Sequence, residues 1–306
     1  MKRSVLIIDD ELDQAEGLAK SLSKSLTNTS FEHVSDEENI ITAIENHYFS
    51  VAIVDLRMDK FSFDGIDLIK KIIEVNPFSK IIIISAFAGE YLSPIKDLFK
   101  TGKILDVIEK KEFTAFTEEL RNIIDEYHVN LFNNPSEINN ALLEFYSQAK
   151  NETDAFKKGE RFENFVSLLF QSIGYSKVTK RVKDKSLNEV DLIIRNEIDD
   201  SFLSKFGKYI LIECKNKPKE NIDKNTFIVF NSKLVHTNHL SELGILATTG
   251  YIARNTYIEA VRTSHDIRKI IFLSNVEFEE LILSHNKLET FKEIIDSQVK
   301  ENYHFC

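Results

Sequence analysis

Four short apolar runs in the first 115 residues most constrain this chain, because each run is followed directly by a charged or hydroxyl residue. The runs are rich in β-branched residues and apolar on both sides, a pattern typical of parallel strands covered by helices on both faces. The carboxyl ends of such strands meet at one crevice, so the residues that follow them are expected to lie together. These residues are Asp9 and Asp10 after 5–8, Asp55 after 51–54, Ser85 after 81–84, and Lys110 after 104–108.

The residue types at this crevice indicate phosphoryl chemistry. Carboxylates crowded together repel one another and have raised pKa values unless a divalent cation lies among them, and Mg²⁺ suits oxygen ligands. If Asp55 attacks a phosphoryl donor, the metal and the Lys110 ammonium neutralise the transferred charge, while the Ser85 hydroxyl hydrogen-bonds a phosphoryl oxygen. The pattern therefore predicts an aspartate that accepts a phosphoryl group.

Residues 1–128 resemble the receiver domain of two-component response regulators. The matching segments are Val5–Glu11, Val54–Met58, Ile84–Ala86 and Asp106–Lys110. The resemblance implies a flavodoxin-like, doubly wound parallel sheet of five strands and a sensor histidine kinase as partner. It also implies roles for individual residues: Asp55 as phosphoacceptor, Asp9 and Asp10 as Mg²⁺ ligands together with Asp55, and Ser85 and Lys110 as the groups that sense the phosphoryl group.

Two departures from the receiver pattern bear on mechanism. The Asp-Gly pair that follows the phosphoacceptor comes late, at Asp64-Gly65, which predicts a lengthened loop through residues 60–63. Val107 stands three residues before Lys110, where receivers often have an aromatic residue that rotates inward on activation. The second departure argues against an aromatic switch and leaves phosphorylation untouched.

Length and periodicity predict two domains. A chain of 306 residues with 42% hydrophobic content can bury about two cores of ordinary size. Apolar residues at helical spacing over 116–127 indicate the last helix of the first domain, Pro135 interrupts the pattern, and a second helix follows through Leu142 and Tyr146. We therefore expect a receiver domain over 1–128, a helical connector over 129–154 and an α/β effector domain with C-terminal helices over 155–306.

Composition narrows the location and the partners. Two cysteines are too few for a disulfide framework, and no stretch approaches the roughly 20 apolar residues that cross a bilayer or resembles a signal peptide. A cytoplasmic protein without a membrane segment is expected. The net charge of −10 hides a mildly basic segment over 150–233, with 17 Lys and Arg against 13 Asp and Glu. Its densest patch, a candidate contact for nucleic acid, contains Lys177, Lys180, Arg181 and Lys183. A solvated charged hairpin explains the same charges.

Charged residues in the second half form a pattern of their own. The segment from Gly159 predicts a helix that ends at Gly174. Glu163 lies next to the apolar face of this helix. Residues 189–194 and 209–215 read as strands, the second with Glu213 and Lys215 on one face. If the two strands pair, Asp191 joins that face. Two carboxylates beside a lysine can bind Mg²⁺, activate a water molecule and stabilise a phosphorane.

This pattern resembles the PD-(D/E)xK nuclease superfamily, especially Mrr-type restriction endonucleases and archaeal Holliday-junction resolvases. The carriers are the Gly-x-x-x-Glu helix of 159–163, the strand aspartate, the Glu-Cys-Lys triplet of 213–215, and a following strand over 244–250. The resemblance implies a mixed restriction-endonuclease-like sheet. It also implies site roles: Asp191 and Glu213 as Mg²⁺ ligands, Lys215 as catalytic lysine, and Glu163 as a supporting acid.

Two functional hypotheses follow from the joint presence of both patterns. The preferred one is a response regulator in which phosphorylation of Asp55 controls a Mg²⁺-dependent nuclease acting on DNA. The alternative is a phosphorylation-controlled nucleic-acid-binding or dimerisation module that keeps the nuclease fold without turnover. These residues do not decide DNA against RNA. The last apolar segment, over 276–295, fits either helices that cover the sheet or a surface that pairs two copies of the chain.

Overall fold

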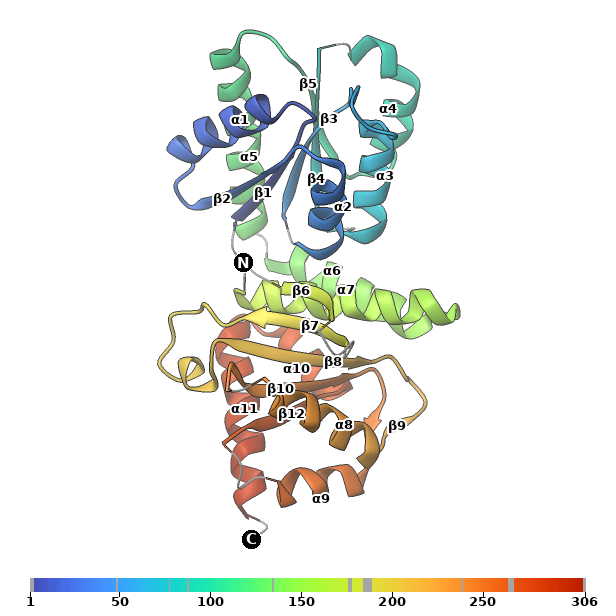
Figure 1. Ribbon diagram of the computed structural model, residues 1–306, viewed down its shortest axis with the longest axis vertical. Helices are drawn as coiled ribbons and strands as arrows, with labels where there is room; N and C mark the ends of the chain where they lie inside the picture. The colour runs from blue at the N-terminus through green and yellow to red at the C-terminus, as the bar shows by residue number, and fades with distance from the viewer. Residues whose placement is uncertain are drawn as a thin grey trace. The chain divides into compact units, whose positions relative to one another are not determined.

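The chain folds into two compact units. The computed structural model describes residues 3–47, 49–76, 78–86, 88–133, 135–175, 178–183, 189–237, 239–263 and 267–304. Contacts separate residues 2–135 from residues 136–306, and each unit contains its own sheet (Figure 1). In the described ranges, no helix is both long and apolar enough to span a membrane.

The first unit is a five-stranded parallel sheet of order β2-β1-β3-β4-β5, which confirms the predicted doubly wound fold (Figure 1). Helices α2, α3 and α4 pack on one face, and α1 and α5 on the other. The strands are β1 (Arg3–Ile8), β2 (Thr29–Val34), β3 (Val51–Asp55), β4 (Lys80–Ser85) and β5 (Ile104–Glu109). The helices are α1 (Leu12–Ser25), α2 (Glu37–Asn46), α3 (Gly65–Val75), the 3₁₀ helix η1 (Ala88–Tyr91), α4 (Leu92–Phe99) and α5 (Phe113–Asn133).

The second unit contains a five-stranded mixed sheet of order β12-β10-β8-β7-β6, as predicted. Strand β10 is parallel to β8 and β12, whereas β7 is antiparallel to β6 and β8. The strands are β6 (Val178–Lys183), β7 (Glu189–Arg195), β8 (Tyr209–Lys215), β10 (Ser241–Thr248) and β12 (Lys269–Leu273), with a separate pair β9 (Asn221–Ile222) and β11 (Tyr251–Ile252). The helical segments are α6 (Pro135–Asn151), α7 (Ala155–Ile173), η2 (Leu203–Phe206), α8 (Lys224–Val235), α9 (Arg254–Arg262), α10 (Asn275–Leu283) and α11 (Lys287–His304).

Aromatic packing joins α7 to the last two helices. The Phe165 ring lies 5.2 Å from that of Phe278 in α10, and the Phe170 ring lies 5.3 Å from that of Phe291 in α11. Gly174, with a φ of 129°, ends α7 as expected from its freedom to adopt positive φ. Of the two interpretations of the last apolar segment, the structure shows helices that cover the sheet of their own unit.

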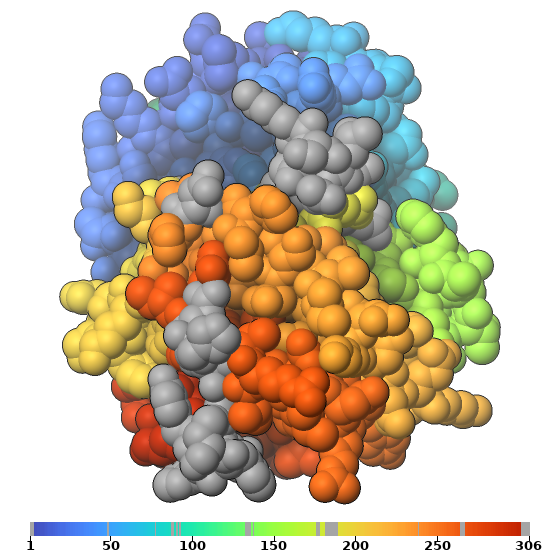
Figure 2. Space-filling model, turned by 60° about the horizontal axis from the view of Figure 1, so that its bottom comes forward, coloured from blue at the N-terminus to red at the C-terminus, as the bar shows by residue number. Residues whose placement is uncertain are grey.

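Helices α8 and α9 cover one face of the sheet of the second unit. Phe227 and Phe230 of α8 pack with Leu211 of β8 and Leu246 of β10, and Ala260 of α9 belongs to the same cluster. The outer sides of these helices, in orange, form much of the face shown in Figure 2. Because side chains alternate along a strand, Glu213 and Lys215 share the α8 face with Leu211.

Helix α6 packs into the second unit although it follows α5 almost directly in the chain. Its Leu142, Tyr146 and Ala149 are buried, and the Tyr146 ring lies 4.8 Å from the Phe165 ring. The Lys287 ammonium of α11 donates a hydrogen bond of 2.8 Å to Asn139 of α6. The segment predicted as a connector, 129–154, is therefore divided: residues 129–133 extend α5 of the first unit, and α6 belongs to the second unit.

A buried histidine anchors α5 to the sheet of the first unit. The Ser50 hydroxyl donates to the Ser4 carbonyl oxygen at 2.7 Å, so the His128 Nε2–H donates to Ser50 Oγ, also at 2.7 Å. His128 Nδ1 is then the deprotonated nitrogen, and it is buried without a hydrogen-bond partner. Burial, helped by the charge of Arg3, lowers the pKa of His128 to about 4.

We predict that this histidine makes the first unit acid-sensitive. Between pH 6.5 and 4 the unfolded state binds a proton that folded His128 does not, so the free energy of unfolding falls by about 3 kcal/mol as the pH decreases through this window. Hydrogen exchange of β3 and α5 in full-length protein should show this loss in the wild type relative to His128→Gln. Equal pH dependence in the two proteins would contradict the assignment.

Candidate functional site

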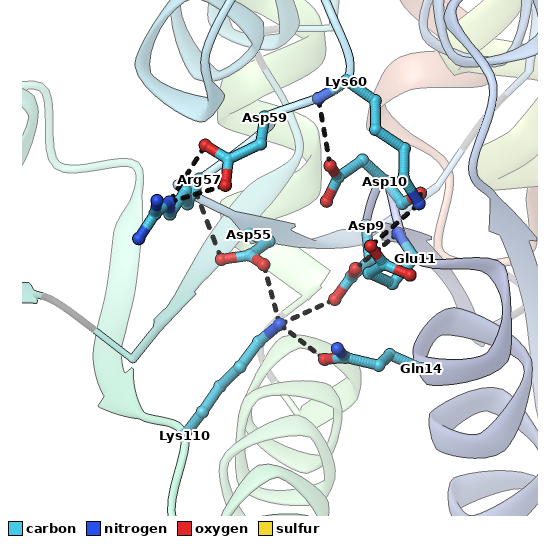
Figure 3. Close-up of polar contacts among 9 residues, drawn as sticks. All are labelled: Asp9, Asp10, Glu11, Gln14, Asp55, Arg57, Asp59, Lys60 and Lys110. Atoms are coloured by element: carbon cyan, nitrogen blue, oxygen red, sulfur yellow. Dashed lines mark hydrogen bonds and ion pairs between the residues drawn. The ribbon is translucent and has the colours of Figure 1, made fainter.

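Three carboxylates meet at the carboxyl end of the first sheet. Asp9 and Asp10 follow β1, and Asp55 ends the adjacent strand β3 (Figure 3). One oxygen from each carboxylate lies within 4.8 Å of the others, and all three residues are buried. This is the convergence predicted from the apolar runs, and it needs a cation because like charges repel strongly at this distance.

Lys110 supplies a cation from the end of β5. Its ammonium lies 2.7 Å from Asp55 Oδ2, 2.8 Å from Asp9 Oδ2 and 3.0 Å from Gln14 Oε1 (Figure 3). Burial raises the pKa of Asp55 above its ordinary value, against the opposing effect of the Lys110 ammonium. Burial lowers the pKa of Lys110, but the hydrogen bonds of its ammonium to Asp55 and Asp9 outweigh this effect and raise the pKa overall.

Ser85 occupies the neighbouring strand end. It is fully buried as the last residue of β4, and its carbonyl oxygen accepts a hydrogen bond from the Lys110 backbone N–H at 3.0 Å. This bond ties the end of β4 to the residue that carries the ammonium. All five residues predicted for the first site thus lie at one end of the sheet, at or directly after the ends of β1, β3, β4 and β5.

Sequence reasoning missed a second lysine at this pocket. The Lys60 ammonium lies 2.8 Å from Glu11 Oε1 and 3.0 Å from the Asp10 carbonyl oxygen, and the Lys60 backbone N–H donates to Asp10 Oδ2 at 3.3 Å (Figure 3). Lys60 begins the segment predicted as a lengthened loop, and the extra residues are the signal that marked it. The loop is thereby fastened to the start of α1.

The first site has the donor set of a Mg²⁺ site. Its three acids offer carboxylate oxygens, which are hard ligands of the kind that Mg²⁺ prefers. Among the described residues, Asp55 Oδ1 accepts one long hydrogen bond, of 3.4 Å from the Arg57 N–H, while Oδ2 is held by Lys110. Asp9, Asp10 and Asp55 therefore fit the role of metal ligands.

A second charged cluster lies on β7 and β8. Asp191 Oδ2 accepts a hydrogen bond of 2.6 Å from the Cys214 backbone N–H, beyond the last regular pair of the two strands, Leu192 and Ile212. The Lys215 ammonium lies 2.7 Å from Glu213 Oε1. Burial, and then the charge of Glu213, raises the pKa of Asp191. The predicted pairing of these strands is confirmed.

A lysine outside every predicted motif completes this cluster. The Lys233 ammonium of α8 lies 2.8 Å from Glu213 Oε2 and 2.7 Å from the Glu189 carbonyl oxygen. Lys233 follows Phe230 by three residues, so it sits beside the apolar face that packs α8 on the sheet. The sequence signal that could have identified Lys233 was a charged residue at the border of an apolar helix face.

Glu163 does not join the other two acids in a compact group. Among the described residues, the three acids of the first unit are the one set of three metal-ligating side chains whose oxygens lie within 4.8 Å of one another. Glu163 still acts on the cluster, since its charge adds to burial and to Asp191 in raising the pKa of Cys214. A supporting role for Glu163 remains a prediction.

The structure describes only some of the residues that were predicted to contact nucleic acid. The Lys180 ammonium donates to the side-chain oxygen of Asn164 on α7, so it is engaged within its own unit. Lys177 and the side chains of Arg181 and Lys183 lie outside the described residues. The basic patch stays a prediction.

Strand β10 fixes the end of β8. The Thr248 hydroxyl donates to the Lys215 carbonyl oxygen at 3.0 Å, and the Thr249 hydroxyl donates to Asn216 Oδ1 at 2.7 Å. Gly250 leaves no room for a side chain, because a Cβ there would lie 2.2 Å from the Lys217 carbonyl oxygen. The segment that ends in Gly250 thus holds the backbone that carries Glu213 and Lys215.

Comparison with family models finds two matches that together span most of the chain. Residues 5–125 match the response regulator receiver domain, and residues 155–282 match a restriction endonuclease domain. The response regulator receiver protein CpdR of Brucella abortus (strain 2308) is 30% identical over 105 residues, which are 34% of this chain and 83% of that protein.

Solved structures similar to this chain include two from receiver proteins. A receiver domain protein (CheY-like) of Methanospirillum hungatei JF-1 is 19% identical, with a TM-score of 0.35, and the match covers 42% of this chain and 99% of that one. A response regulator of Thermotoga maritima is 20% identical, with a TM-score of 0.33, and the match covers 41% of this chain and 99% of that one.

Gly65 allows the backbone at Asp55 to pass close to the start of α3. A Cβ at position 65 would lie 2.1 Å from the Asp55 carbonyl oxygen and 2.6 Å from the Leu56 Cα. We predict that Gly65→Ala lowers the free energy of unfolding by about 2 kcal/mol or more, because these backbone atoms cannot move without displacing Asp55.

The matched control is Gly17→Ala in α1, where a Cβ meets nothing within 4 Å. That change should stabilise the helix by about 0.5–1 kcal/mol. Hydrogen exchange of β1 and β3 in the full-length variants measures both effects. An unchanged β3 in Gly65→Ala would show that the loop yields more easily than its contacts indicate.

Proposed function

Because the chain belongs to the response regulator family, we propose that phosphorylation of Asp55 controls a Mg²⁺-dependent nuclease in the second unit that cleaves DNA. The chain joins a receiver domain to a restriction-endonuclease-like domain. The observation that carries the proposal is that each domain holds carboxylates and lysine in direct contact, at the residues that the two family patterns mark.

The receiver geometry supports transfer of a phosphoryl group to Asp55. A carboxylate oxygen of Asp55 attacks the phosphorus of a phosphohistidine in a sensor kinase, the P–N bond breaks, and an acyl phosphate forms. Lys110, already 2.7 Å from Asp55 Oδ2, neutralises part of the transferred charge. A Mg²⁺ ion held by Asp9, Asp10 and Asp55 would supply the remaining positive charge.

We predict that full-length protein takes up one phosphoryl group from acetyl phosphate in the presence of Mg²⁺. Asp55→Asn should abolish the uptake, because the amide is not a nucleophile. Asp59→Asn, an exposed acid four residues away that pairs with Arg57, is the matched control and should keep it. Intact mass spectrometry measures the added mass. Full phosphorylation of Asp55→Asn would place the acceptor elsewhere.

The effector geometry supports hydrolysis of a phosphodiester. Asp191 and Glu213 would hold a Mg²⁺ ion, which acidifies a bound water. Lys215 would orient that water or stabilise the charge as the phosphorus–oxygen bond of the leaving group breaks. Among the described residues, Asp191 Oδ1 accepts no hydrogen bond, so an oxygen is available to a metal. DNA is the proposed substrate because the matched family model describes a restriction endonuclease.

One observation favours the second candidate, a nucleic-acid-binding module without turnover. Both oxygens of Glu213 are occupied by ammonium groups, Oε1 by Lys215 and Oε2 by Lys233. The two ammonium charges weaken the attraction of Glu213 for a metal ion, so a metal would bind more tightly once one of these contacts is loosened. If neither lysine yields, the domain keeps its fold and its charge but hydrolyses nothing.

Helix α6 supports control of the effector by the receiver. Helix α5 ends at Asn133 and α6 begins at Pro135, and the Ala149 carbonyl oxygen of α6 accepts a hydrogen bond of 2.8 Å from the Asn216 side-chain amide. Asn216 also donates to the Lys158 carbonyl oxygen in α7, at 2.6 Å, and directly follows Lys215. A shift of α6 would therefore reach the strand end that carries the proposed catalytic lysine.

We predict that plasmid DNA is nicked or cleaved in the presence of Mg²⁺, and that beryllofluoride, which mimics the phosphoryl group, changes the rate. Asp191→Ala and Lys215→Ala should reduce cleavage by about 10²-fold or more, because each removes a group that acts in the transition state. Asp55→Ala should keep basal cleavage and lose the response to beryllofluoride.

The outcomes of this assay separate the two candidate functions. Equal activity in the wild type and in the Asp191 and Lys215 variants would refute the proposed nuclease. Salt-sensitive DNA binding that needs no metal and survives Lys215→Ala, without cleavage, would support the binding module instead. Parallel assays with single-stranded RNA decide which nucleic acid is the substrate.

A further inference from the structure

Lys233 belongs to neither family pattern, yet it is the more firmly held of the two lysines on Glu213. Its ammonium has two partners, Glu213 Oε2 at 2.8 Å and the Glu189 carbonyl oxygen at 2.7 Å, and its side chain is 18% exposed. Lys215 is 30% exposed, and Glu213 is its one hydrogen-bond partner among the described residues. The two lysines therefore differ in how easily they can leave.

The position of the Lys233 ammonium would also suit a metal ion. It lies between a carboxylate oxygen and a backbone carbonyl oxygen, both of which are hard ligands for divalent cations. It arrives from α8, whereas its two partners lie on β8 and β7. The ammonium thus joins three elements at a point where a second cation would otherwise bind.

Charge balance at this cluster opposes metal binding. Asp191 and Glu213 carry two negative charges, and Lys215 and Lys233 carry two positive ones, so the four groups are formally neutral. A Mg²⁺ ion that binds Glu213 gains little from the net charge and meets a nearby ammonium. Removing one ammonium leaves a net negative cluster that attracts a divalent ion.

We propose that Lys233 is a fixed cation that limits this site to one weakly bound divalent ion, with Lys215 as the ammonium that leaves Glu213 when the ion binds. The inference rests on the proposed function in one respect, since it takes Asp191 and Glu213 as the metal ligands. Lys233 acts through Glu213 and is a positioning residue. Its mobile neighbour Lys215 is then free to face a phosphodiester.

The test is a titration of full-length protein with Mn²⁺, followed by electron paramagnetic resonance. The protein carries Asp9→Asn and Asp10→Asn, which remove two of the three carboxylates of the receiver site without changing side-chain size. We expect Lys233→Met to bind Mn²⁺ roughly tenfold more tightly than this parent, or better, because a repelling charge 2.8 Å from Glu213 Oε2 is gone. Lys233→Gln, which can still donate hydrogen bonds, should show the same gain.

Two control variants separate local charge from other effects. Lys233→Arg keeps the charge and should bind Mn²⁺ like the parent. Lys224→Met makes the same change in net charge nine residues earlier on α8, about 13 Å along the helix, where Lys224 pairs with Glu259. It should also match the parent. An equal gain in Lys224→Met, or no gain in either neutral Lys233 variant, would overturn the proposal.

Plasmid cleavage by the same variants distinguishes this inference from the proposed function. If the parent cleaves DNA and neither neutral Lys233 variant binds Mn²⁺ more tightly, the inference fails and the nuclease assignment stands. If the neutral variants gain Mn²⁺ binding while no variant cleaves, the inference stands and the nuclease assignment fails.

Discussion

Buried carboxylates at the ends of β-strands require a cation, and this requirement organises both halves of the molecule. Parallel strands bring their carboxyl ends together whatever the residues there, so the fold itself forces Asp9, Asp10 and Asp55 into one pocket. Without a partner such a group would protonate or open the sheet end. Lys110 provides that partner by spanning Asp9 and Asp55, and it is itself held because its backbone N–H bonds to the end of β4.

The sequence predicted whatever depended on apolar periodicity and missed what depended on single polar contacts. Strands β1, β3 and β4 were visible because most of their residues are buried on both faces, as parallel strands between two helical layers must be, whereas β5 was visible from its short apolar runs alone. Strand β2 has a polar, edge-strand sequence and carried no such signal. Lys60 and Lys233 were missed for a related reason, because each reaches its carboxylate from an element that is distant in sequence, and the local pattern around it does not identify the partner.

The connector shows that a sequence can predict a helix correctly without showing which domain the helix packs against. Periodicity marks α6 as amphipathic, but its apolar face fits any apolar neighbour. The structure supplies what the pattern lacks, namely the Tyr146 ring against Phe165 and the Asn216 amide on the Ala149 carbonyl oxygen. These contacts make α6 part of the effector core and link its last turn to the strand end beside Lys215.

The two sites differ in charge, and this difference predicts that they differ in affinity for a divalent cation. Three buried carboxylates face one buried ammonium in the receiver, since Lys60 is half exposed and screened, so the pocket keeps a net negative charge. Two carboxylates face two ammonium groups in the effector, which leaves no net charge to attract an ion. The charges therefore favour a divalent cation in the receiver pocket, whereas a cation in the effector would compete with two ammonium groups for Glu213. If Lys215 leaves Glu213 when a metal binds, the contacts that hold the neighbouring backbone would influence that step, and the Asn216 amide ties this backbone to Ala149 of α6.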